Sequence, residues 1–210
     1  MKQITIIDYG SGNLHSIAKA FEKQSTAKGY KIIVSNNPSD LKQASHIVLP
    51  GVGAFADCIN GLNAIKGMRD ELEINVRQKY KPFLGVCVGM QMLADLGMEN
   101  GIHKGLGWIN GEVIKLSPTD KNLKIPHMGW NDLVIKNDHR VLKGIKSGDD
   151  VYFVHSYHFN CRNIKDVISV TNYGLPVVAA IAHENIIASQ FHPEKSHSTG
   201  LRFISNFMEI

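Results

Sequence analysis

Short apolar runs alternate with amphipathic segments along the first half of the chain. The apolar runs are rich in β-branched residues and end at turn residues, as buried strands do. Between them, apolar residues recur at helical spacing, as at Leu14, Ile17 and Phe21. The predicted strands are 2–8, 31–34, 46–49 and 83–86; the predicted helices are 14–23 and 68–80, with a short helix or turn at 38–44. This alternation predicts an α/β fold with a largely parallel sheet.

The pattern changes after a helix that is predicted to begin at Val88. Glycines interrupt the chain, and strands then follow without long helices between them. The predicted strands are 112–116, 132–135, 151–154, 167–171, 177–182 and 186–189. This strand-rich second half predicts an antiparallel extension of the sheet. Exposed loops are expected at 126–131 and 155–158, and their Trp, Met, Tyr and His side chains suit either a contact surface or partly buried packing.

Composition and charge fit one soluble domain that spans residues 1–210. Hydrophobic residues make up 43% of the chain and charged residues 20%, which is ordinary for a globular protein. The net charge of +4 is dispersed, so no nucleic-acid partner is expected. No apolar run has membrane-spanning length, and the first ten residues do not form a signal peptide. The three cysteines, Cys58, Cys87 and Cys161, are too few for a disulfide framework and favour a cytoplasmic location.

The turn after the first strand carries Gly10 and Gly12, a spacing that occurs in dinucleotide-binding loops. The third glycine of that fingerprint is replaced by His15, and no acidic residue stands at the expected distance near the end of the second strand. Dinucleotide binding is therefore rejected, and no cofactor is expected. The turn nevertheless lies at the carboxyl end of a strand, where α/β proteins place functional loops.

A nucleophile elbow with cysteine in place of serine is predicted at the end of the strand at 83–86. Gly85 and Gly89 stand two residues to either side of Cys87, and helix-forming residues follow. In such a turn the nucleophile has strained backbone, while the glycines let the strand and the helix approach closely. A cysteine at the start of a helix is also favoured as the thiolate. Cys87 is therefore the candidate nucleophile, whereas Cys58 and Cys161 lack the flanking glycines.

A possible oxyanion hole follows the strand at 46–49. The loop Pro50-Gly51-Val52-Gly53 has two glycines directly after a buried strand, so its backbone N–H groups can face a ligand. In the elbow architecture, one oxyanion donor is the N–H of the residue after the nucleophile, here Val88. The second comes from the loop after a neighbouring strand. The sequence thus predicts donors at Val88 and in the Val52-Gly53 region.

A general base is predicted near the carboxyl end of the chain. His192 and Glu194 stand two apart on either side of a proline, whose fixed φ can hold the carboxylate near the imidazole. Together with Cys87 they supply a nucleophile, a base and an orienting acid. Metal binding is the competing interpretation, but His183-Glu184 is not followed by a histidine at 187, and no cysteine pair has zinc spacing. No metal site is expected.

These segments resemble the class I (triad) glutamine amidotransferases. The resemblance rests on the elbow 85–91, the loop 50–53 and the segment 190–196. Within that class, the segments 8–13, 126–131 and 152–157 resemble the glutaminase subunits of imidazole glycerol phosphate synthase, which serve histidine biosynthesis. The resemblance covers almost the whole chain. It implies a mixed, mostly parallel sheet flanked by helices.

The resemblance also implies an activity and a partner. L-Glutamine would be hydrolysed through a thioester on Cys87, with ammonia delivered to a (β/α)8-barrel cyclase in a heterodimer. The residues implied to bind glutamine are Gly53, Gln91, Glu99 and the backbone of Ser156 and Tyr157. The residues implied to face the cyclase are Asn13, Trp130, Tyr152 and Lys195.

The sequence departs from the family pattern at two positions. It also leaves two alternative functions open. Val88 replaces a more usual leucine, which is harmless if only its N–H acts, and Ser16 stands where some relatives have asparagine. The chain could instead be a glutaminase of the same class that serves another synthase, such as one in surface-sugar biosynthesis. It could also be a non-catalytic regulatory subunit that kept the fold. An intact set of Cys87, His192 and Glu194 argues against the latter.

Overall fold

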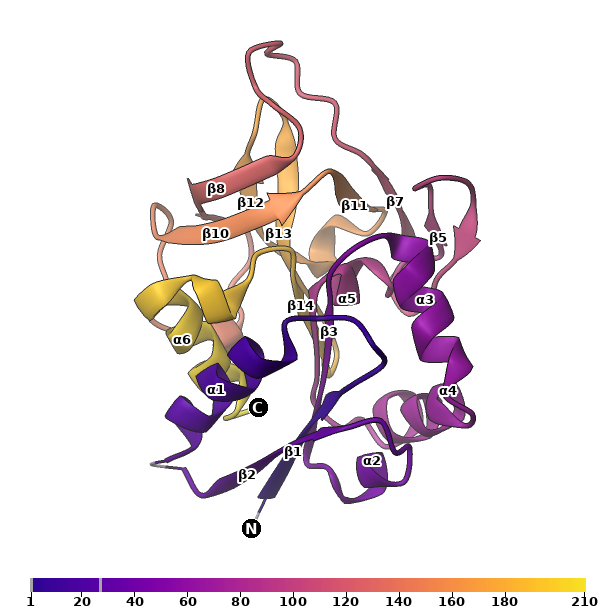
Figure 1. Cartoon of the computed structure of the whole chain (residues 1–210). Helices are drawn as coiled ribbons and strands as arrows, with labels where there is room; N and C mark the ends of the chain where they lie inside the picture. Colours follow the sequence, from indigo (N-terminus) through magenta and orange to yellow (C-terminus); the bar gives the residue numbers. More distant parts are fainter. Residues whose placement is uncertain (1, 27) are drawn as a thin grey trace.

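A computed structural model describes residues 2–26 and 28–210 of the chain (Figure 1). Its centre is an eight-stranded sheet with the strand order β2-β1-β3-β4-β14-β13-β12-β9. The strands are β1 Lys2–Ile7, β2 Tyr30–Ser35, β3 His46–Gly51, β4 Phe83–Cys87, β5 Leu96–Gly97, β6 His103–Lys104, β7 Gly111–Lys115, β8 His127–Asp132, β9 Val134–Ile135, β10 Asp150–His155, β11 Tyr157–Cys161, β12 Val167–Asn172, β13 Pro176–His183 and β14 Ile186–Ser189. The α-helices are α1 Leu14–Ser25, α2 Asp40–Gln43, α3 Phe55–Ala64, α4 Met68–Leu72, α5 Val88–Gln91 and α6 His197–Phe207.

The central sheet is parallel in one part and antiparallel in the other. Strands β2, β1, β3, β4 and β14 pair in parallel, whereas β13, β12 and β9 continue the sheet in antiparallel fashion. The mixed sheet is thus confirmed, and so is an antiparallel extension by β13, β12 and β9. The predicted strands at 112–116 and 151–154 instead lie in two smaller sheets, β11-β7-β5-β6 and β10-β8. Strand β4, which is buried throughout, lies between β3 and β14. The elbow that follows β4 is therefore placed at the centre of the sheet.

Helices cover both faces of this sheet. Figure 1 shows α1 and α6 together on one side, and α3 and α4 on the other. In α1 the predicted stripe is buried: Ile17 and Phe21 face the core, and Phe21 packs edge-on against Phe207 of α6 at 6.2 Å between ring centroids. Burying an aromatic side chain of this kind contributes about 1.5–3 kcal/mol. The amphipathic pattern of α1 thereby joins the two helices on one face of the sheet.

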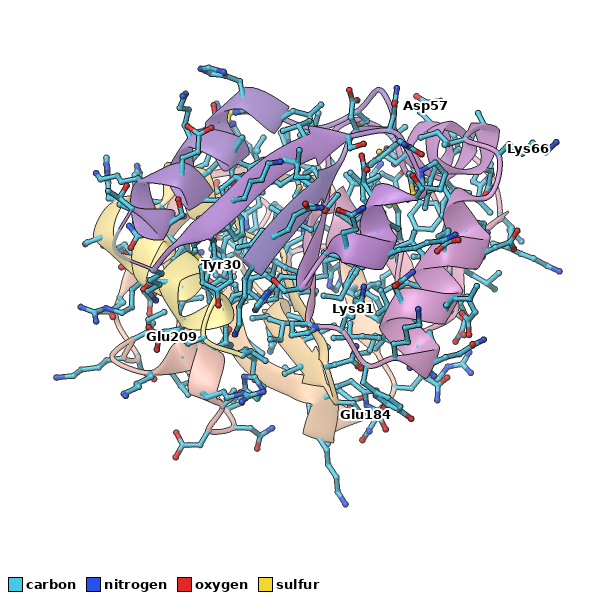
Figure 2. The ribbon with its side chains drawn as sticks, turned by 90° about the horizontal axis from the view of Figure 1, so that it is seen from below. Tyr30, Asp57, Lys66, Lys81, Glu184 and Glu209 are labelled. Carbon is cyan, nitrogen blue, oxygen red and sulfur yellow. The ribbon has the colours of Figure 1, made fainter. Side chains whose placement is uncertain are left out.

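The two ends of the parallel strands form opposite faces of the molecule. Figure 2 views the molecule from below and labels Tyr30, Lys81 and Glu184, which lie at or just before the amino ends of β2, β4 and β14. Lys81 donates hydrogen bonds to the carbonyls of Leu41 and Lys42, at 2.7 and 2.8 Å, and so ties α2 to the start of β4. Cys87 lies at the other end of β4, away from this face.

The expected loop at 126–131 is a strand instead, and this prediction was wrong. β8 pairs with β10 in an antiparallel ribbon, in which Trp130 lies opposite Tyr152. Side chains alternate between buried and open along β8, and His127 is buried while Met128 is exposed. The strand is mostly polar and has little intrinsic preference for strand structure. Its pairing with β10, which is distant in sequence, decides its conformation.

The helices also differ from the predictions in several places. The predicted helix 68–80 is α-helical only to Leu72 and continues as a π-helix over Glu73–Gln78. The helix at Val88 is a single turn, α5. Helices α3 and α6 were not predicted. In α6, Gly200 weakens the helical signal, but a Cβ there would lie 2.0 Å from the Pro193 carbonyl oxygen, so close packing requires glycine. No helix of residues 2–26 and 28–210 combines the length and apolar character needed to cross a membrane.

Candidate active site

Cys87 occupies the tight turn between β4 and α5. Its φ of 55° is unusual for a residue other than glycine, and such a conformation costs about 1–3 kcal/mol. A Cβ at Gly85 would lie 2.7 Å from the Gly89 carbonyl oxygen, and one at Gly89 would lie 1.9 Å from the Leu49 carbonyl oxygen. Only glycine therefore allows β3, β4 and α5 to approach this closely. The backbone around Cys87 has the strain and the close packing that the elbow pattern predicts.

Cys87 lines a cavity of about 570 Å³, which has the size of a small-molecule site. Cys87 itself is only 4% exposed. Most of the predicted site residues line this cavity, namely Asn13, Val52, Gly53, Cys87, Val88, Gln91, Glu99, Ser156, Tyr157, His192 and Lys195. Glu194, Trp130 and Tyr152 do not line it. Loops far apart in the sequence thus meet at the carboxyl end of the parallel strands.

Glu194 lies behind His192, hydrogen-bonded to its ring. The distance from His192 Nδ1 to Glu194 Oε1 is 2.8 Å, and both side chains are 2% exposed. The backbone of His192 is fixed by its N–H, which donates to the Tyr152 carbonyl at 2.9 Å, and by its carbonyl, which accepts from Ser196 Oγ at 2.6 Å. Glu194 therefore orients the ring so that its other nitrogen, Nε2, stays available.

The protonation of His192 follows from its neighbours. Burial lowers the pKa of the ring, but Cys87 and Glu194 outweigh burial and raise the pKa of His192 to about 10. His192 Nε2 has no hydrogen-bond partner of normal geometry within the described part of the chain. These neighbours favour the protonated ring, in which one N–H is directed away from Glu194. Such a group can deliver a proton to a leaving group.

Gln91 and Gln190 connect the cavity wall to the nucleophile. Gln91 Nε2 donates to the Tyr157 carbonyl at 2.9 Å and to Gln190 Oε1 at 3.0 Å, and Gln190 Nε2 lies 3.7 Å from Cys87 Sγ. Gln91 was predicted to bind substrate, and its Oε1 remains for a ligand. Gln190 is fully buried and had been given no role. The sequence did carry a signal for such a role, because a glutamine that follows a buried strand and stands two residues before the base needs hydrogen-bond partners.

Glu99 lies at the cavity wall and is partly engaged by the protein. Its Oε2 accepts a hydrogen bond at 2.8 Å from the N–H of Phe55, the first residue of α3. One carboxylate oxygen thus satisfies an N–H group that has no partner within the helix. The other oxygen, Oε1, is left for a cationic or N–H group of a ligand. Glu99 therefore connects the loop 50–53, which leads into α3, to the substrate cavity.

The Val52-Gly53 loop is held by a residue that the sequence did not indicate. Ser11 Oγ accepts from the Val52 N–H at 3.2 Å and donates to the Val52 carbonyl at 2.6 Å. Gly53 has a φ of 95°, which lets the chain turn sharply there. Ser11 belongs to the turn after β1, which was expected to be functional only from its place at a strand end. The Val52 N–H is engaged by Ser11 in this structure.

Aromatic and basic side chains lie side by side next to the cavity. The Trp130 ring is 5.9 Å from the Tyr152 ring and stacks on His197 at 4.7 Å, and Lys195 Nζ lies 5.6 Å from the centre of the Tyr152 ring. Trp130 is 47% exposed. We call Trp130, Tyr152, Lys195 and His197 the aromatic patch. Lys195 belongs to both the patch and the cavity lining, so the patch is continuous with the mouth of the site.

Comparisons with known proteins agree with this architecture. The family profile described as "Glutamine amidotransferase class-I" matches residues 5–210. Two solved structures have the same fold: "Crystal structure of glutamine amidotransferase" has a TM-score of 0.73 at 17% identity and covers 98% of this chain and 99% of its own. "Structure of PurLQS from Thermotoga maritima" has a TM-score of 0.72 at 15% identity and covers 99% and 98%. The chain belongs to the class I glutamine amidotransferases.

Closer relatives narrow the family. The chain is 50% identical to the imidazole glycerol phosphate synthase subunit HisH of Bradyrhizobium diazoefficiens, over 98% of this chain and 97% of that protein. It is also 50% identical to HisH of Rhodospirillum rubrum, over 98% of each. For HisH of Agrobacterium fabrum the identity is 48%, again over 98% of each. The chain is a member of the HisH family of imidazole glycerol phosphate synthase subunits and, by its class, an enzyme that acts on glutamine.

Proposed function

We propose that the whole chain acts as a single glutaminase domain and delivers ammonia to a (β/α)8-barrel cyclase, as a subunit of imidazole glycerol phosphate synthase in histidine biosynthesis. The observation that carries this proposal is the strained Cys87 at the same cavity as His192, whose ring is paired with the buried carboxylate of Glu194. The names of the relatives support the particular synthase. The cytoplasmic location expected from the sparse cysteines stays part of the proposal.

In the first half of the reaction, the sulfur of Cys87 attacks the side-chain amide carbon of L-glutamine. A carbon–sulfur bond forms, and the carbonyl oxygen becomes an oxyanion. Val88 supplies one N–H donor to this oxyanion, because the first residue of α5 has no partner for its N–H within the helix. The protonated ring of His192 then gives its Nε2 proton to the amide nitrogen. Ammonia leaves, and a glutamyl thioester remains on Cys87.

In the second half, water hydrolyses the thioester. His192, now neutral, takes a proton from the water as it attacks the thioester carbon. The carbon–sulfur bond breaks, glutamate is released, and the sulfur and the ring return to their starting protonation states. Glu194 stabilises the ring whenever it is charged, since its carboxylate is 2.8 Å away and equally buried.

The substrate is positioned by several groups that line the cavity. The Oε1 atoms of Gln91 and Glu99 are acceptors that suit the α-ammonium group or the amide N–H groups of glutamine. The backbone of Gly53, Ser156 and Tyr157 completes the binding site. Backbone N–H groups of these loops are the proposed donors to the α-carboxylate.

The second oxyanion donor is the Val52-Gly53 region, and we propose that its availability is controlled. Ser11 engages the Val52 N–H at 3.2 Å, so this donor is withheld from a substrate at Cys87. One missing oxyanion donor lowers kcat by about 10²–10³-fold. The free subunit is therefore expected to be slow. Asn13, Trp130, Tyr152 and Lys195 form the proposed cyclase interface, and docking there would move the neighbouring turn of Ser11.

The function is tested by glutamate release from glutamine, first with the purified chain and then with the barrel cyclase and its ribonucleotide ligand. Strong stimulation that is lost in Cys87→Ala is expected. Cys161→Ser is a matched control, because Cys161 does not line the cavity and its loss should leave the rate unchanged. Equal rates with and without the cyclase would keep the glutaminase but overturn the assignment to this synthase.

A further inference from the structure

We propose that Gln190 is a positioning residue for the nucleophile and presents a side-chain N–H to the sulfur of Cys87. Gln190 follows β14 directly and has no solvent exposure. Its Nε2 lies 3.7 Å from Cys87 Sγ, within the range of an N–H···S hydrogen bond. Its backbone N–H donates to the Ala179 carbonyl at 2.8 Å, which fixes the residue against β13. This proposal rests on the proposed role of Cys87 and extends it.

The orientation of the Gln190 amide follows from a single backbone carbonyl. The carbonyl of Tyr157 can only accept, so the end of the Gln91 side chain that lies 2.9 Å from it is the NH₂ group. The second N–H of that group points at Gln190 from 3.0 Å, and the end of Gln190 facing it is therefore the oxygen. The NH₂ group of Gln190 is left facing Cys87. A reversed amide at either glutamine would bring two donors or two acceptors together.

The Tyr157 carbonyl is itself held by a buried chain of donors. His155 Nδ1 lies 3.0 Å from it and must carry a proton, so neutral His155 accepts at Nε2 from His127 Nδ1, also at 3.0 Å. Neutral His127 then accepts at Nε2 from Asn131 Nδ2 at 3.2 Å. Each donor and acceptor in this chain has one consistent assignment. The chain connects β8 to the carbonyl that orients both glutamines.

A donor at the sulfur has a definite chemical consequence. An N–H that donates to the sulfur favours the thiolate over the thiol, because hydrogen bonds to charged groups are stronger than those to neutral ones. His192 also lies at this cavity, but its N–H is needed for the leaving ammonia. Gln190 can remain bonded to the sulfur throughout the reaction. Its loss should therefore raise the pH at which Cys87 becomes reactive.

The test is the pH dependence of Cys87 alkylation by iodoacetamide, with the modified peptide quantified by mass spectrometry so that Cys58 and Cys161 are scored separately. Gln190→Met removes the donor with little change in volume, and Gln190→Glu keeps an acceptor for Gln91 but removes the donor and adds a charge. We expect the midpoint, the pH at which the alkylation rate of Cys87 is half-maximal, to rise by about one unit in the Met variant and further in the Glu variant.

Ser189→Ala is the matched control, since Ser189, the last residue of β14, is equally buried but bonds to the Phe191 carbonyl at 3.1 Å. Its midpoint should equal that of the wild type. A midpoint that is unchanged in the folded Gln190 variants would overturn the proposal, because a purely structural role would lower the rate at every pH alike. If neither variant folds, the Gln190 side-chain amide signals of the wild type decide by NMR: they must shift as Cys87 titrates. The assay needs no glutamine, so its outcome is independent of whether the proposed function holds.

Discussion

The hydroxyl of Ser11 is predicted to suppress the basal glutaminase rate, so Ser11→Ala should raise it. Ser11 makes two hydrogen bonds to the backbone of Val52, at 3.2 Å with its N–H and at 2.6 Å with its carbonyl, which belong to the peptide units on either side of the residue. Each bond stabilises the observed orientation by about 0.5–1.5 kcal/mol, and the low half of this range applies because Ser11 is partly exposed. Losing both should shift the equilibrium between orientations of the Val52 backbone by about 1–2 kcal/mol. The fraction of chains with a free Val52 N–H then rises by about 5–30-fold.

The gain in basal rate has an upper limit, which is the full contribution of one oxyanion donor. An oxyanion donor that is fully restored contributes about 10²–10³-fold to kcat, so Ser11→Ala should recover only part of the effect of the cyclase. The assay is glutamate release by the free variant chain, compared with the same variant saturated with ligand-bound cyclase. The saturated rate should match that of the wild type, because the partner already frees the donor.

A matched control is Ser147→Ala. Ser147 Oγ accepts from the backbone N–H of Ile135 at 2.9 Å, which is the same kind of bond between residues that do not line the cavity. This variant should show the wild-type basal rate. A folded Ser11→Ala chain whose basal rate equals or falls below that of the wild type would refute the reasoning, since the Ser11 bonds would then not limit the oxyanion hole.

Two further predictions concern the triad and the buried histidines. Glu194→Gln should lower kcat by about 10³–10⁴-fold with a much smaller change in KM, because an amide cannot stabilise the charged ring of His192; steady-state kinetics check this, and more than a tenth of the wild-type kcat would contradict it. Acid should destabilise the fold through His155. Burial, followed by the nearby His127, lowers the pKa of His155 to about 3, well below the value near 6.5 expected in the unfolded chain. The unfolded state therefore binds more protons between these values, and stability falls as the pH drops through this window, by up to about 1.4 kcal/mol per unit for this group. Urea unfolding at pH 7 and pH 5 measures the loss; His155→Gln should show a smaller pH dependence, and an equal dependence would count against the assignment.

The sequence was sufficient to predict those features whose structure is determined by residues close together in the chain. The strain at Cys87 arises from the tight turn between its own flanking glycines, so the elbow is visible in five consecutive residues. The pair of His192 and Glu194 is equally local, since one proline separates them. The parallel strands were predictable because buried runs and amphipathic helices alternate. These features depend on chemistry within a few residues.

The hydrogen-bond partners that complete the site were decided by the tertiary structure. Ser11 contacts Val52 because β1 and β3 are neighbouring parallel strands, so the loops that follow them lie side by side at the carboxyl end of the sheet. Gln190 meets Gln91 only because β14 lies beside β4. In the sequence, each of these is an ordinary polar residue with many possible partners. Its role is fixed once burial leaves it a single donor or acceptor within reach.

The sequence by itself therefore determined the nucleophile, the base and the class of fold, because each is encoded by spacing along the chain. Only the folded chain decided which groups orient them. β8 shows the same division: its mostly polar segment carries no strand signal, and it becomes a strand by pairing with β10. Local backbone geometry is set by neighbouring residues, whereas hydrogen bonds between distant segments depend on how the sheet is ordered. That physical difference separates what could be predicted here from what had to be seen.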